Sequence, residues 1–189
     1  MPEVLRTLLN ITESLTQRKL LEEASVRSER MLGLASTLDR LAGGPTLLTL
    51  SAQGVAANVF SAMGTEAAGA FPEGHRRAIE VYIGLEKVAN EGGMRRMGLV
   101  SKAQRAMCLW HLDETDSAES LFREVASAAT PNFLKTRADA LLNLSLVLAE
   151  TGRSAEGETI ALEGLRLYLE IGDHASARDA ERVLSVVRG

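Results

Sequence analysis

The sequence has a single cysteine, Cys108, so no disulfide bond can form within the chain. Only 4% of its residues are aromatic, and its apolar fraction of 46% comes mostly from Ala and Leu. Ala and Leu favour helices, whereas β-branched and aromatic residues favour strands. The shortage of strand-forming residues therefore predicts an all-α protein.

The chain also lacks a strong excess of one charge, since its net charge is −4 and the two signs are interspersed. Nucleic-acid binding needs a basic patch, so we expect no direct contact with nucleic acid. The longest apolar run, residues 138–149, is shorter than the roughly 20 residues that cross a bilayer. No basic segment with a following apolar core marks a signal peptide. We therefore expect a cytoplasmic protein without membrane contact.

Glycines divide the chain into segments whose apolar residues recur every three or four positions, which is the helical period. Gly43, Gly152 and Gly172 follow apolar runs, as C-terminal helix caps do, and Asp173 is placed to cap a helix start. The first two predicted helices could also form one continuous helix. The predicted helices cover residues 3–22, 24–42, 46–63, 75–90, 94–113, 117–129, 132–150, 154–171 and 174–188.

A small residue recurs at a long period. Ala78, Ala118 and Gly157 are 40 and then 39 residues apart, and each precedes another core position by one helical turn. Aligning the two Ser-Ala-Glu triplets at Ser117 and Ser154 gives a spacing of 37 instead. Such periods are typical of stacked helix pairs, in which a small side chain lets the two helices approach closely.

The segment "ALLNLSLVLAETGRSAEGETIALEGL", residues 140–165, resembles a tetratricopeptide (TPR) repeat, with Gly152 at the turn and Glu156-Gly157 opening the second helix. Residues 168–187 resemble the longer repeats of bacterial signal-responsive transcription activators. The resemblance implies a TPR-like α-solenoid over residues 44–189. Residues 113–115 depart from the pattern, because they replace the turn glycine.

The same resemblance assigns groove positions on the first helices of the pairs. The groove would bind an apolar helix or peptide of a protein partner, with Trp110 as anchor, Met107 as an adaptable wall and arginines at the rim. The alternative is that these residues form an ordinary core. The assigned positions are Val100, Ala103, Met107 and Trp110 in one pair, and Asp139, Leu142 and Leu146 in the next.

Residues 1–43 match no family motif, and they are predicted to form an N-terminal cap or an oligomerisation segment. Their second half has an apolar stripe at three-four spacing. This stripe could pack on the repeats or form a short coiled coil between two copies, so the prediction of a homodimer stays open. The stripe consists of Leu20, Ala24, Met31, Leu34, Leu38 and Leu41.

No set of residues indicates catalysis. Cys108 and His111 are three apart on one predicted helix, but no third group would orient the imidazole. No pair of histidines has the spacing of zinc ligands. We therefore expect a non-enzymatic protein without cofactor or metal. It would act as a protein-binding scaffold or, alternatively, as a regulatory sensor that binds a small ligand or signalling peptide in a transcription-control system.

Overall fold

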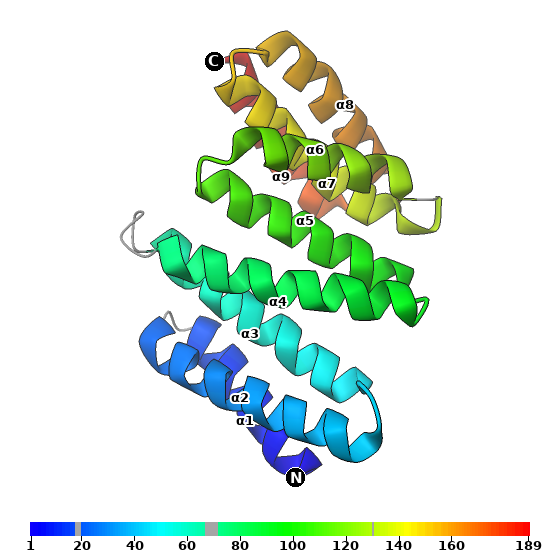
Figure 1. Cartoon of the computed structure of the whole chain (residues 1–189). Coiled ribbons are helices and arrows are strands. Elements are labelled where there is room, and N and C mark those ends of the chain that lie inside the picture. Colours follow the sequence, from blue (N-terminus) through cyan, green and yellow to red (C-terminus); the bar gives the residue numbers. More distant parts are fainter. Residues whose placement is uncertain (18–19, 67–71, 130) are drawn as a thin grey trace. The chain divides into compact units, whose positions relative to one another are not determined.

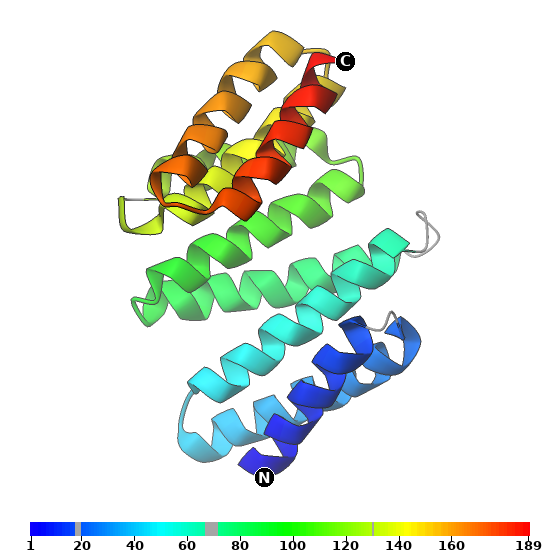
Figure 2. The ribbon, with the colours of Figure 1, turned by 180° about the vertical axis from the view of Figure 1, so that it is seen from behind.

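The computed structural model describes residues 1–17, 20–66, 72–129 and 131–189, and every regular element within them is a helix (Figures 1 and 2). This confirms the all-α prediction. The contacts divide the chain into two compact units, Met1–Met94 and Arg95–Gly189. The division falls inside the segment 44–189, which the sequence assigned to one repeat domain.

In its described residues, the first unit contains four helices that pack in chain order. α2 packs on α1 and α3, α3 packs on α4, and α1 also contacts α3. Residues 1–43 are therefore joined to the two helices that follow them. α2 ends at Gly43, whose positive φ of 75° fits the predicted glycine cap. The helices are α1 (Pro2–Gln17), α2 (Leu21–Ala42), α3 (Leu47–Glu66) and α4 (Pro72–Glu91).

The apolar stripe of α2 is partly used inside this unit. Ala24 and Met31 are fully buried, whereas Leu20 and Leu41 at the two ends are 49% and 74% exposed. The middle of the stripe therefore belongs to the core of the unit. Pairing with a second copy stays a prediction.

α3 is unusually apolar for a helix of this chain. The stretch Leu47–Thr65 has a mean hydropathy of 1.2, and by its length and composition alone it could cross a membrane. A core helix meets the same criterion, and 44% of this stretch is buried. α1, α2 and α4 all pack on α3, which accounts for its composition.

The five α-helices described in the second unit form two layers. Each helix packs on the next, and α5 also contacts α7, which contacts α9. Figure 2 shows α5, α7 and α9 in front, and Figure 1 shows α6 and α8 in front. A core of buried side chains from Leu99 to Leu184 lies between the layers. The helices are α5 (Arg95–His111), α6 (Thr115–Ala128), α7 (Leu134–Glu150), α8 (Ser154–Glu170) and α9 (His174–Arg188), with a short 3₁₀ turn at Pro131–Phe133.

The turns after α5, α7 and α8 each contain a residue in the left-handed conformation. Gly152 and Gly172 have φ of 78° and 73°, and Asp113 occupies the corresponding place between α5 and α6 with φ of 61°. Aspartate tolerates this conformation better than most side chains do. The departure from the TPR pattern at residues 113–115 therefore changes the turn residue but preserves the turn.

Small residues lie where the paired helices approach closely, as predicted. Ala118 and Gly157 are the fourth residues of α6 and α8, and both are buried. A Cβ atom on Gly157 would lie 2.7 Å from the carbonyl oxygen of Ser145. In the first unit the corresponding approach is at Gly74, where a Cβ would lie 2.6 Å from the Phe60 oxygen. Ala78, one turn further along α4, is also fully buried.

Candidate functional site

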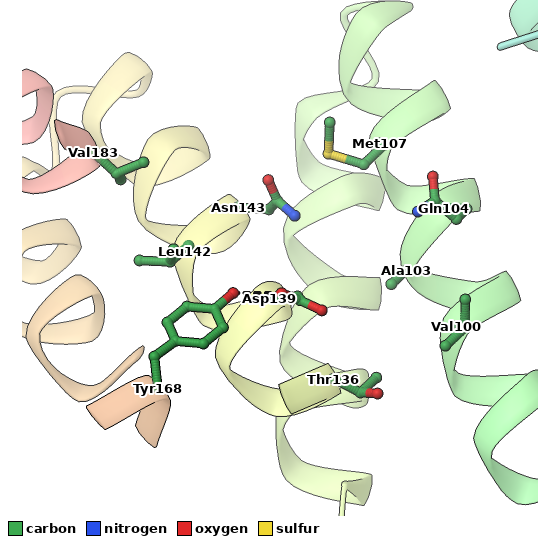
Figure 3. A pocket seen from close by; sticks show the side chains of 10 residues that line it. All are labelled: Val100, Ala103, Gln104, Met107, Thr136, Asp139, Leu142, Asn143, Tyr168 and Val183. Atoms are coloured by element: carbon green, nitrogen blue, oxygen red, sulfur yellow. Dashed lines mark hydrogen bonds between the residues drawn. The ribbon is translucent and has the colours of Figure 1, made fainter. Parts of the chain in front are cut away.

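A pocket of about 290 Å³ opens on the layer formed by α5, α7 and α9 (Figure 3). Its walls come from four helices, because Tyr168 of α8 reaches between α7 and α9. Most of its surface is apolar, with polar groups gathered around α7. The lining residues are Val100, Ala103, Gln104, Met107, Thr136, Asp139, Leu142, Asn143, Tyr168 and Val183.

Of the seven residues assigned to the groove, the fold brings five together at this pocket. Val100, Ala103 and Met107 lie one above another on α5, and Leu142 faces them from α7. Val100 is 41% exposed and Leu142 only 8%, so the pocket has an accessible rim and a buried floor. Their spacing of three and four residues puts such side chains on one helix face.

Trp110 and Leu146 do not line this pocket. The indole Nε1 of Trp110 donates a hydrogen bond to Glu150 Oε2 at 2.6 Å, which joins the end of α5 to the end of α7. The indole ring also stacks on His111, with centroids 5.8 Å apart. Trp110 thus connects two helices, whereas the sequence assigned it as the anchor of the groove. Leu146 is half-buried further along α7.

Tyr168 and Asp139 form the polar corner of the pocket. The Tyr168 hydroxyl donates a short hydrogen bond to Asp139 Oδ1, and Figure 3 shows the two groups turned toward each other. Burial, followed by this hydrogen bond, raises the pKa of Tyr168 above its usual range. The hydroxyl therefore stays protonated at neutral pH and acts as a donor. The sequence predicted Asp139 at the groove but missed Tyr168, because groove positions were assigned only to the first helices of the pairs.

Lys135 links this corner to the start of α9. Its Nζ lies 3.0 Å from Asp173 Oδ2 and 3.7 Å from Asp139 Oδ1, and it stands 5.1 Å from the centre of the Tyr168 ring. Asp173 also caps α9 as predicted, since its Oδ1 accepts the backbone N–H of Ser176 at 3.1 Å. The Ser176 N–H, the Lys135 ammonium and the Ser176 hydroxyl lower the pKa of Asp173 to about 2.

Cys108 and His111 differ in their exposure. Cys108 is fully buried, whereas His111 is exposed beside Trp110. Among the residues that the structure describes, no group of three or more His, Cys, Asp or Glu side chains could hold a metal ion. The polar groups of the pocket are suited to hydrogen bonding and charge recognition.

Comparison with known proteins identifies the fold. No family model and no curated protein matches the sequence. The TPR-like repeats of a Podosopora anserina protein described as a kinesin light chain match with a TM-score of 0.68 and 14% identity, over 100% of this chain and 96% of that chain. BtubC from P. vanneervenii matches with a TM-score of 0.66 and 14% identity, over 100% of this chain and 82% of that one.

A third structure, PilF from Pseudomonas aeruginosa, has a TM-score of 0.52 and 17% identity, over 99% of this chain and 78% of that one. Identities this low show the fold alone. The chain thus has the TPR-like helical repeat fold that the sequence predicted.

Proposed function

We propose that this protein is a non-enzymatic scaffold that binds a protein or peptide partner in the pocket between α5, α7 and α9. The observation that carries the proposal is the set of apolar side chains at the open side of a repeat layer, with Val100 41% exposed and Met107 half-buried beside it. The volume of about 290 Å³ lies at the lower end of the range for small-molecule sites, which favours an inserted side chain.

The arrangement supports recognition of an apolar segment. An aliphatic side chain in the pocket would lose its water-exposed surface against Val100, Met107 and Leu142, and such burial is the main favourable term in association. The polar groups of Asn143 and Gln104 lie beside these side chains and can hydrogen-bond a partner's backbone or side chains. This division into apolar wall and polar rim is typical of protein-binding sites.

A random peptide-display library panned against the intact protein tests the proposal. We expect the library to yield enriched peptides. Their capture should fall about tenfold in the double variant Val100→Ala/Met107→Ala, because both substitutions remove apolar contact area. Trp110→Ala is the matched control: it should lower the free energy of unfolding by about 1–3 kcal/mol but leave capture by the folded protein unchanged. If enrichment is insensitive to the double variant, the pocket is not the binding site.

The alternative function, a regulatory sensor in transcription control, would use the same pocket for a small ligand. The buried Tyr168 hydroxyl and the Asp139 carboxylate support it, since paired polar groups of this kind orient small molecules. A dose-dependent rise of the melting temperature with a small molecule, abolished by Asp139→Asn, would favour the sensor. The resemblance of residues 168–187 to activator repeats motivates this alternative and stays a prediction, as does the cytoplasmic location.

A further inference from the structure

The pocket has one charged lining residue among its ten described ones, and that residue is acidic. The Asp139 side chain is 46% exposed, so it is accessible to a partner. Tyr168 and Lys135 both approach the same carboxylate oxygen, Oδ1, and Oδ2 takes no part in either contact. One oxygen is therefore held in place, and the other is available for recognition.

The surrounding charges leave this corner acidic. The Lys135 ammonium is shared between Asp139 and Asp173, and it is closer to Asp173, at 3.0 Å against 3.7 Å. Asp179 is paired with Arg182 at 2.9 Å, and its negative charge also acts on Tyr168. Two carboxylates thus share one ammonium group, and an incoming cation would meet a net negative charge.

The carboxylate is also fixed before a partner arrives. Tyr168 is only 3% exposed, and its hydroxyl donates to Asp139 from a side chain packed between α7 and α9. Lys135 lies over the ring of the same tyrosine at 5.1 Å. A group held in this way loses little conformational freedom on binding, so more of the interaction free energy contributes to affinity.

We infer that the partner segment carries an aliphatic side chain next to a lysine or arginine, and that this cation binds Oδ2 of Asp139 while the aliphatic group enters the pocket beside Val100 and Met107. The inference rests on the proposed function and deepens it by stating the chemistry of the partner. It also reverses the sequence-based expectation of arginines at the rim, since none of the pocket's lining residues is basic. A charge-assisted hydrogen bond to a carboxylate is stronger than a neutral one.

The test uses the intact protein and the peptides enriched from the random display library. We expect the enriched sequences to share a Leu, Ile or Val beside a Lys or Arg. The affinity of the strongest peptide, measured by fluorescence anisotropy, should fall about three- to tenfold in Asp139→Asn, because the asparagine oxygen still accepts from Tyr168 but the charge is lost. The affinity of the same peptide should also fall as salt is added.

Asp116→Asn is the matched control, because it removes the same charge from a residue of α6 outside the pocket lining and should leave the affinity unchanged. Circular dichroism establishes that both variants are folded. If peptides bind through Val100 and Met107 but are acidic or uncharged, or bind Asp139→Asn equally well, the inference is wrong and the scaffold function stands. If no peptide depends on Val100 and Met107, both proposals are wrong.

Discussion

At the scale of single residues, the structure shows why glycine occupies a buried helix position at Gly157. Alanine would normally be preferred inside a helix by about 1 kcal/mol. Here a Cβ atom would lie 2.7 Å from the backbone oxygen of Ser145 and 3.2 Å from a methyl carbon of Val187. A backbone oxygen cannot rotate away, so the cost of the contact exceeds the gain in helix propensity.

We predict that Gly157→Ala lowers the free energy of unfolding by about 1–3 kcal/mol, as overpacked core sites do. Gly84→Ala is the control, since Gly84 is exposed inside α4 and no atom outside its own helix lies within 4 Å of its Cβ position. That substitution should raise stability by about 0.5–1 kcal/mol. Urea unfolding followed by circular dichroism measures both. A stabilising Gly157→Ala would contradict the close helix approach.

Residue roles were only partly predictable from the sequence. Its periodicity places Val100, Ala103, Met107 and Leu142 on helix faces, because face membership depends on spacing alone. It could not distinguish Trp110 from these residues, because the hydrogen-bond partner of Trp110 is 40 positions away in the chain. Tyr168 was missed for a similar reason: its partner Asp139 is brought close only by the crossing of α7 and α8.

At the scale of helices, the sequence predicted most boundaries well because the signals that end a helix are local. Glycines with positive φ follow α2, α7 and α8, where they were expected. α4 begins at Pro72, three residues before the predicted start. The local sequence contains no signal against this earlier start, so the sequence alone could not place the first residue of the helix. Residues 67–71 of the loop expected before it lie outside the described residues.

The start of α9 gives a prediction at this scale. Asp173 has a folded-state pKa of about 2, below its ordinary value of 3.8, so its ionised form stabilises the folded state above about pH 4. This stabilisation is lost as the pH falls through 2. Asp173→Asn can still cap the helix but cannot titrate. We expect the stability difference between the two proteins to be largest near pH 5 and to shrink toward pH 2 in urea unfolding.

Asp179→Asn is the control for this experiment, because Asp179 lies on the same helix without capping it. A stability difference for Asp173→Asn that stays constant between pH 5 and pH 2 would show that the lost contact with Lys135 is not electrostatic in origin.

At the scale of the whole molecule, the chain consists of two units, and the second has a core of its own. All the buried residues of that core lie between Leu99 and Leu184. The sequence could not locate the division, because Met94 and Arg95 lie at a helix boundary like several others. Only the tertiary contacts show that this helix boundary, and not another, divides the two units.

We therefore predict different outcomes for two truncations. A chain that starts at Arg95 keeps α5 to α9 and should be helical, monomeric and cooperatively unfolding. A chain that starts at Gly44 loses α1 and α2, which uncovers α3, and should associate or lose helicity. Circular dichroism with light scattering measures both. An unfolded 95–189 fragment would show that the second core is not sufficient for stability.

The order of the helices along the chain determines which of its neighbours α3 can contact during synthesis. During synthesis α1 and α2 emerge from the ribosome before α3, and both pack on it in the finished unit. The apolar stretch Leu47–Thr65 therefore meets two of its three neighbours as soon as it emerges, and only α4 must still follow. We therefore expect less of the segment's apolar surface to be exposed to water while the chain is still growing.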